Sequence, residues 1–226
     1  MKLLIDDANV TWIKKLLKYY PIDGVTTNPT ILSRTGRPPY EALKEIRSLL
    51  GDERELHIQV LSSDAEGMVK EAKKIISEIP GNTFIKIPCV PEGFAAMQLL
   101  KEEGIHTTGT TVFTPMQALL AAKSGASYVA PYVNRIDLLG FDGVLVAKQI
   151  HQILTVYGYP CRVLAASFKN TQQMQELALA GIASITSPPD LIEEYVNNPV
   201  IYTSIQSFED NFARVYGEGL DMTKFD

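Results

Sequence analysis

Short apolar segments alternate with amphipathic segments along almost the whole chain. The short segments are predicted to be strands, because they combine β-branched and aromatic residues and are bounded by glycine, proline or polar residues. They are Lys2–Asp6, Gly24–Asn28, Leu56–Leu61, Thr83–Pro88, Ile105–Val112, Ser127–Tyr132, Arg162–Ser167 and Ala183–Thr186. Helical spacing follows each of them, at residues 9–19, 40–50, 64–79, 91–104, 115–123, 142–157, 171–180 and 189–196. Such alternation indicates a parallel sheet of the α/β class.

Eight strand–helix units in about 200 residues predict a closed (β/α)8 TIM barrel. An open doubly wound sheet is the alternative, but no glycine-rich phosphate-binding signature follows any predicted strand. One further helix, 203–216, is surplus to the eight units and carries an apolar stripe made of Ile205, Phe208, Phe212 and Val215. We expect residues 1–226 to form one barrel domain, with this helix packed on its own barrel or on a neighbouring subunit.

Charge and cysteine content restrict the partners and the compartment. The 226 residues carry a formal net charge of −5 without a basic cluster, which argues against nucleic-acid and anionic-membrane partners. No apolar run reaches the ~18 residues of a membrane span, and Asp6 and Asp7 come too early for a signal peptide. Cys89 and Cys161 form neither a CxxC motif nor a disulfide framework. We therefore expect a cytoplasmic protein without membrane contact.

A lysine lies in the middle of a strand that is predicted to be buried. Lys86 is part of Thr83–Pro88, and lysine is almost never fully buried unless it is paired. Burial disfavours an ammonium group relative to the neutral amine, and a neutral amine attacks ketones to form a Schiff base. Three interpretations stay open for Lys86: a catalytic amine, a phosphate clamp, or an edge-strand side chain that points to water.

Polar residues gather at the C-terminal ends of the predicted strands, where TIM barrels carry their active sites. Each alone would suit an internal hydrogen bond, but so many at one rim predict a site. They are Asp6, Thr26, Asn28, Gln59, Thr108, Thr110, Tyr132, Ser167, Ser184 and Thr186. Asp6 suits either an ion pair with the lysine or the proton transfers of carbinolamine formation. Tyr132, Gln59 and Thr110 are uncharged groups that could hold one water molecule.

An anion-binding end of the site is predicted after the sixth strand. Arg135 lies there, and its planar guanidinium binds a phosphate or carboxylate through two hydrogen bonds. A surface ion pair with Asp137 is the alternative. Ser167, with its backbone N–H, could add further anion contacts.

No metal or cofactor is expected. His57, His106 and His151 lie on separate elements without the spacing of zinc ligands. His57 is predicted to be a core residue, Cys89 a packing residue, and Lys169 a solvated lysine in a loop.

Several stretches of the chain resemble the transaldolase family in order. They are Asp6, Gly24–Pro29 (GVTTNP), Phe84–Pro88 (FIKIP), Ala130–Asp137 (APYVNRID) and Val163–Lys169 (VLAASFK). The match covers essentially the whole chain. Within the family, the sequence most resembles a small bacterial subfamily of fructose-6-phosphate aldolases. The resemblance implies a homo-oligomer, because relatives form pentameric rings stacked into decamers, with the last helix reaching a neighbour.

The resemblance also implies a class I aldolase of carbohydrate metabolism, related to enzymes of the pentose phosphate sugars. Lys86 would form the Schiff base beside Asp6, with reversible cleavage of fructose 6-phosphate to dihydroxyacetone and glyceraldehyde 3-phosphate. Neither metal nor cofactor is implied. The candidate residues for binding the sugar phosphate are Thr26, Asn28, Arg135 and Ser167.

Two positions bear on the choice between aldolase and transaldolase. Small transaldolases of the family usually carry glutamate at position 59 and phenylalanine at position 132, where this chain has Gln59 and Tyr132. A tyrosine with a held water can protonate the enamine intermediate and let dihydroxyacetone leave. Asp7, Cys89 and Pro91 depart from the usual residues near the mouth and leave donor preference open. A transaldolase and a barrel that only binds sugar phosphates are the alternative functions.

Overall fold

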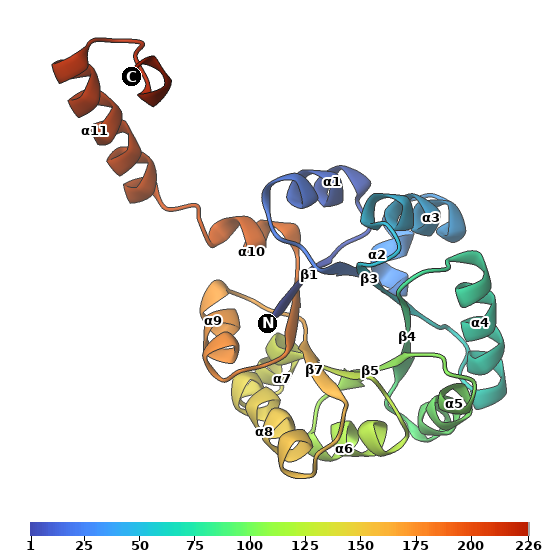
Figure 1. The fold of residues 1–226 in the computed structure, drawn as a ribbon. Helices are drawn as coiled ribbons and strands as arrows, with labels where there is room; N and C mark the ends of the chain where they lie inside the picture. Colours follow the sequence, from blue (N-terminus) through green and yellow to red (C-terminus); the bar gives the residue numbers. More distant parts are fainter. Residues whose placement is uncertain (226) are drawn as a thin grey trace. The chain divides into compact units, whose positions relative to one another are not determined.

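The computed structural model describes residues 1–225. Eight parallel strands close into a barrel in chain order (Figure 1). They are β1 (Lys2–Asp6), β2 (Gly24–Thr26), β3 (Glu55–Gln59), β4 (Thr83–Pro88), β5 (Thr107–Val112), β6 (Tyr128–Pro131), β7 (Arg162–Ala165) and β8 (Ser184–Ser187). The last strand pairs with the first, with Leu4 opposite Thr186. The predicted (β/α)8 TIM barrel is therefore confirmed.

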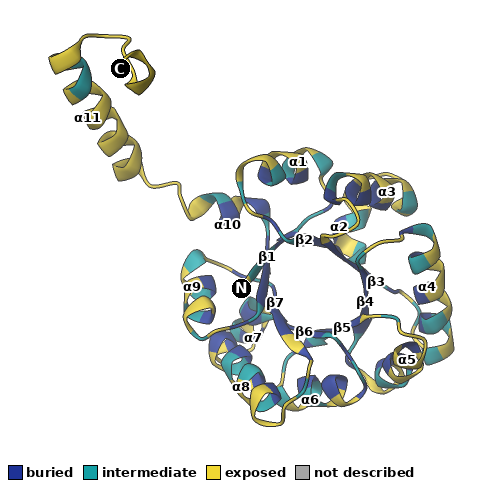
Figure 2. Ribbon diagram, in the orientation of Figure 1, coloured by how far each residue is buried: buried dark blue, intermediate teal, exposed yellow. Residues whose placement is uncertain are grey.

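Helices surround these strands, and the strands they cover are mostly buried (Figure 2). Each longer helix places an apolar stripe on the barrel and polar residues outward. The helices of this part of the chain are α1 (Val10–Tyr19), α2 (Pro29–Ser33), α3 (Pro39–Leu50), α4 (Ala65–Glu78), α5 (Pro91–Glu102), α6 (Pro115–Lys123), α7 (Val133–Leu138), α8 (Gly143–Val156) and α9 (Thr171–Leu179). Within residues 1–225, no helix combines the length and the apolar character needed to cross a membrane.

The sequence predicts neither α2 nor α7. Both are too short to show an apolar period, and both begin within three residues of the end of a strand. The side chain of Asn28 caps α2 by accepting a hydrogen bond from the Ile31 N–H at 2.9 Å. Tyr132 holds the corresponding position before α7. Two candidate site residues thus lie where a strand turns into a helix.

The chain divides into two compact units, and the second begins at Asp190. It contains most of α10 (Pro189–Glu194), then α11 (Pro199–Tyr216) and a short 3-10 helix, Met222–Lys224. The helix predicted at 203–216 begins earlier, because the side chain of Asn198 accepts a hydrogen bond from the Val200 N–H and Pro199 fits the first turn.

The apolar stripe predicted on α11 is divided in the structure. Ile205 and Phe208 are 47% and 70% exposed. Phe212 instead packs with Tyr216 and Phe225 in an aromatic cluster of the second unit. Val215 is 72% exposed. A contact of α11 with a neighbouring subunit stays a prediction, and Ile205, Phe208 and Val215 are the residues of the stripe that could make it.

Aromatic rings fill the interior of the barrel. The His57 ring stacks on Phe84, with centroids 4.7 Å apart, and the edge of Tyr128 meets both rings. These residues come from β3, β4 and β6, so their contact places them inside the barrel rather than under the helices. His57 is fully buried, which agrees with the core role predicted for it.

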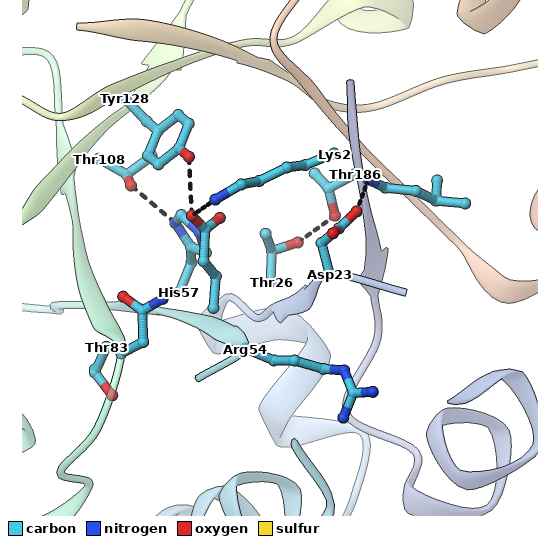
Figure 3. Close-up of polar contacts among 12 residues, drawn as sticks. Lys2, Asp23, Thr26, Arg54, His57, Thr83, Thr108, Tyr128 and Thr186 are labelled. Carbon is cyan, nitrogen blue, oxygen red and sulfur yellow. Dashed lines mark hydrogen bonds and ion pairs between the residues drawn. The ribbon is translucent and has the colours of Figure 1, made fainter. Parts of the chain in front are cut away.

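A buried carboxylate links several interior side chains at the N-terminal ends of the strands. Glu55 is 3% exposed and bonds to the Lys2 ammonium, the Tyr128 hydroxyl and the His57 ring. The other ring nitrogen of His57 bonds to the Thr108 hydroxyl at 2.9 Å (Figure 3). We call Lys2, Glu55, His57 and Tyr128 the floor cluster. It closes the end of the barrel opposite to the C-terminal ends of the strands.

The floor cluster keeps its charges compensated. Burial alone would raise the pKa of Glu55, but hydrogen bonds from His57, Lys2 and Tyr128 outweigh it and lower this pKa to about 2. Burial, together with the charges of Lys86 and Lys2, lowers the pKa of His57 despite the opposing effect of Glu55. The carboxylate is therefore ionised and the imidazole neutral at pH 7.

We predict that Glu55→Gln lowers the free energy of unfolding at pH 7 by about 2–4 kcal/mol, because the buried partners lose their carboxylate. A lowered pKa stabilises the folded state fully above the ordinary value of 4.5, and this stabilisation is lost as the pH falls towards 2. The difference between wild type and variant should narrow by about 1 kcal/mol from pH 4.5 to pH 3.5 in urea titrations.

Glu78→Gln is the matched control, since Glu78 pairs with Lys44 on the exposed surface. It should change the free energy of unfolding by less than about 1 kcal/mol. Equal losses in the two variants would show that the floor cluster contributes no more than a surface ion pair.

Candidate active site

Lys86 lies inside the barrel, two residues beyond Phe84 towards the C-terminal end of β4. Its residue is 6% exposed, and its ammonium donates a hydrogen bond to the backbone carbonyl of Thr27 at 2.8 Å. No ion pair to Lys86 is found among residues 1–225. The geometry therefore excludes the water-facing interpretation and leaves a buried amine held by one neutral carbonyl.

Asp6 is oriented by two threonine hydroxyls. The Thr26 hydroxyl donates to Asp6 Oδ1 at 2.7 Å and lies 2.6 Å from the Thr186 hydroxyl (Figure 3 shows the two threonines). A hydroxyl has one proton to donate, so the directions are Thr186 to Thr26 to Asp6. This chain of hydrogen bonds crosses from β8 to β2 and fixes the carboxylate on β1.

The carboxylate and the amine are held by consecutive residues. Thr26 binds Asp6 through its side chain, and Thr27 binds Lys86 through its carbonyl. The simple ion pair between Asp6 and Lys86 is not found in the described chain. The two groups nevertheless lie at the same end of β2, where a carboxylate can exchange protons with a substrate bound to the amine.

Thr110, on β5, and Tyr132, directly after β6, form a pair of hydroxyls. Their oxygens lie 2.8 Å apart, and the ring of Phe113 meets the Tyr132 ring edge-on at 5.8 Å. Gln59 is the neighbour of Lys86 in the β3–β4 register. Its amide has no hydrogen-bond partner within residues 1–225, so it can bind a water molecule or a substrate hydroxyl.

Arg135 lies beside this hydroxyl pair. Its guanidinium carbon is 4.6 Å from the centre of the Tyr132 ring, a cation–π arrangement. The alternative pairing with Asp137 is not found in the described chain. The Asp137 carboxylate accepts hydrogen bonds from the Gly143 N–H and the Gln173 amide instead. The guanidinium is exposed, and its planar face and N–H groups are placed to receive an anion.

Asn28 and Ser167 contribute in different ways. Because the Oδ1 of Asn28 caps α2, the amide nitrogen is the group left to donate to a substrate. Ser167 has a left-handed backbone (φ 61°), and its carbonyl accepts a hydrogen bond from the Asn134 N–H at 2.7 Å. The carbonyls of Ala166 and Ser167 occupy the N–H groups of Val133 and Asn134 at the start of α7, so these two N–H groups are not available to an anion.

Comparisons with known proteins identify the family of the chain and support its fold. A family model described as "Transaldolase/Fructose-6-phosphate aldolase" matches residues 3–225. The chain belongs to this family. A solved structure described as "Native KDPGal structure" has 15% sequence identity and a TM-score of 0.59, and the match covers 84% of each chain. That likeness supports the barrel fold, while membership of the transaldolase/fructose-6-phosphate aldolase family indicates an enzyme of the aldolase or transaldolase type.

The remaining reactive side chains of this family member lie outside the hydrogen-bonded site. Burial, with a smaller effect of Cys161, raises the pKa of Cys89 to about 12, so the thiol stays protonated. Lys169 is exposed. Within residues 1–225, no group of three or more His, Cys, Asp or Glu is arranged to hold a metal ion.

Sequence reasoning missed the residues that act through their backbone. The Thr27 carbonyl that receives Lys86 leaves no trace in a side-chain pattern, since any residue would supply it. Thr186 lies among the polar residues at the strand ends, but nothing local connects it with Thr26. Their hydrogen bond depends on barrel closure, which brings β8 beside β1.

We predict that Thr26→Val lowers kcat at least about tenfold, because Asp6 loses the hydrogen bond that orients it for proton transfer. The free energy of unfolding should fall by only about 1–3 kcal/mol, since one buried hydroxyl is lost and Thr186 is left unpaired. Steady-state kinetics and urea unfolding on the same preparation measure the two effects.

Thr83→Val is the matched control. The Thr83 hydroxyl is also buried in a strand, where it donates to the Ile79 carbonyl and accepts from Arg47. This variant should lose similar stability and keep its kcat. If both variants lose activity in proportion to stability, Thr26 does not orient a catalytic group.

Proposed function

We propose that this enzyme is a class I aldolase that reversibly cleaves fructose 6-phosphate to dihydroxyacetone and glyceraldehyde 3-phosphate. The observation that carries the proposal is a buried amine, Lys86, bonded to the carbonyl of Thr27, with the Asp6 carboxylate oriented by the preceding residue, Thr26. A lysine that served only as a phosphate clamp would need access to a solvated anion, whereas a nucleophilic amine works best in a desolvated pocket.

The first half of the reaction uses Lys86 and Asp6. The amine adds to the ketone carbon C2 of the sugar, and the carbinolamine then loses water to give an iminium ion. Asp6 supplies and removes the protons of these steps. Removal of the proton from the C4 hydroxyl breaks the bond between C3 and C4, and its electrons move into an enamine on Lys86. Glyceraldehyde 3-phosphate leaves as the aldehyde.

The second half decides between aldolase and transaldolase. An aldolase must place a proton on C3 of the enamine and then add water to C2, which releases dihydroxyacetone and restores the amine. The Tyr132 hydroxyl, bonded to Thr110 at 2.8 Å, is the phenol proposed to take part in this protonation. A transaldolase instead keeps the enamine until an acceptor sugar arrives. A phenol at position 132 therefore favours release over transfer.

The phosphate end of the substrate is assigned to Arg135, with Ser167 beside it. Arg135 stacks on Tyr132, the residue proposed to protonate the enamine, so an anion bound by the guanidinium would lie close to that residue. The dihydroxyacetone end is assigned to Asn28, whose amide nitrogen can donate to a hydroxyl. These positions suit a ketose that carries its phosphate on the aldehyde-forming half.

The decisive experiment is incubation with fructose 6-phosphate as the only sugar. We predict continuous release of glyceraldehyde 3-phosphate, measured with a coupled dehydrogenase, because the aldolase regenerates its amine without an acceptor. Lys86→Met should abolish this release and also abolish the covalent adduct that borohydride traps, since methionine fills the space without an amine.

Lys169→Met is the control, because Lys169 is an exposed loop lysine. It should keep both the activity and the borohydride adduct. An adduct that forms without sustained release unless a second sugar is added would identify a transaldolase. A wild-type protein that borohydride does not modify would leave only a sugar-phosphate-binding barrel.

We predict that Arg135→Ala raises KM for glyceraldehyde 3-phosphate in the synthetic direction by about 10- to 100-fold, because a charge-assisted hydrogen bond to the phosphate is lost. The KM for unphosphorylated glyceraldehyde should change much less, as it presents no anion. Arg162→Ala is the control at the opposite end of the barrel, at the start of β7. Equal losses for both aldehydes in Arg135→Ala would assign this arginine a structural role.

A further inference from the structure

Two residues other than glycine have a left-handed backbone within residues 1–225: Thr111 (φ 60°) and Ser167 (φ 61°). A β-branched residue such as threonine rarely adopts this conformation, which persists only where the surroundings enforce it. The two residues lie just at or beyond the C-terminal ends of β5 and β7, the two neighbours of β6. Tyr132 directly follows β6, so left-handed residues flank it on both sides.

Thr111 is an extra residue in β5. Gly109 pairs with Val129, whereas Val112 pairs with Pro131, so β5 takes one residue more than β6 over the same length. This arrangement is a β-bulge, which bends a strand and re-aims its side chains. The Thr111 hydroxyl has no hydrogen-bond partner in the described chain, so any effect of this residue on its neighbours comes from its backbone conformation.

The bulge redirects a carbonyl from one neighbouring strand to the other. The Thr110 carbonyl accepts a hydrogen bond from the Cys89 N–H on the β4 side at 2.9 Å. In a regular strand the carbonyl two residues later points to the same side. The Val112 carbonyl instead accepts from the Tyr132 N–H on the β6 side at 3.1 Å. The left-handed turn at Thr111 produces this change.

Both ends of Tyr132 are consequently held by the residues on either side of Thr111. The backbone N–H is bound by Val112, and the phenol lies 2.8 Å from the Thr110 hydroxyl. Beyond Tyr132, the Ala166 and Ser167 carbonyls bind the N–H groups of Val133 and Asn134 at 2.9 and 2.7 Å.

We propose that Thr111 is a positioning residue, whose left-handed backbone sets the Thr110 hydroxyl and the Val112 carbonyl at the spacing that aims the Tyr132 phenol. The inference rests on the proposed function, in which that phenol takes part in protonating the enamine. It adds a residue that touches neither the substrate nor Lys86 and acts through its main chain.

The backbone requirement has a stability test that is independent of activity. Glycine adopts a left-handed backbone without strain, while alanine does not. We expect Thr111→Gly to unfold at a Tm several degrees above Thr111→Ala. At Thr107, an ordinary position of the same strand, the order should be reversed. A higher Tm for Thr111→Ala than for Thr111→Gly would overturn the proposal.

The functional test compares cleavage of fructose 6-phosphate alone with dihydroxyacetone transfer to erythrose 4-phosphate. Deletion of Thr111 removes the bulge and shortens the spacing between Thr110 and Val112 by one residue, while the pairing of Val112 with Pro131 can be kept. We expect the deletion to lower cleavage at least tenfold while transfer falls much less, as in Tyr132→Phe. A variant that combines the deletion with Tyr132→Phe should cleave fructose 6-phosphate no more slowly than Tyr132→Phe alone. Thr111→Gly allows the left-handed backbone, and Thr111→Val keeps the side-chain shape without the hydroxyl. Both should keep the wild-type ratio of cleavage to transfer.

The outcomes separate this inference from the proposed function. A wild-type ratio in the deletion, with a changed ratio in Tyr132→Phe, overturns the role of Thr111 alone. A changed ratio in Thr111→Val assigns the role to the hydroxyl and also overturns it. An unchanged ratio in Tyr132→Phe overturns both the phenol's role and the inference. Borohydride trapping on Lys86 monitors the fold of the site in each variant, and the Tm comparison decides the case if the deletion does not fold.

Discussion

The hydrogen bond between the Lys86 ammonium and the Thr27 carbonyl is the contact on which the candidate site depends. A carbonyl dipole can hold the amine without a negative charge beside it. Asp6 lies on β1, which is not adjacent to β4, and its carboxylate is bonded to Thr26. The carboxylate of Asp6 and the amine of Lys86 are therefore held by different partners and not by each other.

The two ends of the barrel treat charge in opposite ways. At the floor, Glu55 has three partners, and a full ion pair with Lys2 lies among them. Near Lys86, the charged groups bond to hydroxyls and carbonyls and not to each other. Buried charges cost least when they are fully compensated, so the floor cluster suits a structural role. The groups above it keep hydrogen-bonding capacity for a substrate, as expected at the C-terminal end of such a barrel.

The fold could be predicted from sequence because strand and helix periods alternate without interruption, and Pro88 and Pro115 mark their elements sharply. The polar residues at the strand ends were identifiable for the same reason. Glu55 was not, since a glutamate at the start of a strand looks solvent-exposed until Lys2 and Tyr128 meet it in space. Thr111 was not either, because a β-branched residue favours an ordinary strand. Asn198 and Pro199 are a cap and a first-turn proline that indicate where α11 begins. The prediction placed the start later because it relied on the apolar stripe alone.

The hydrogen-bond chain from Thr186 through Thr26 to Asp6 has a consequence for how the enzyme matures. It joins the last strand of the barrel to the first two, across the seam where the sheet closes. A chain folded only as far as β7 already contains Lys86, Thr110 and Tyr132, but nothing donates to Thr26. Asp6 would then lack its full support. During synthesis or refolding, the candidate site therefore becomes complete only when β8 docks, so closure of the barrel and completion of this hydrogen-bond network are one event.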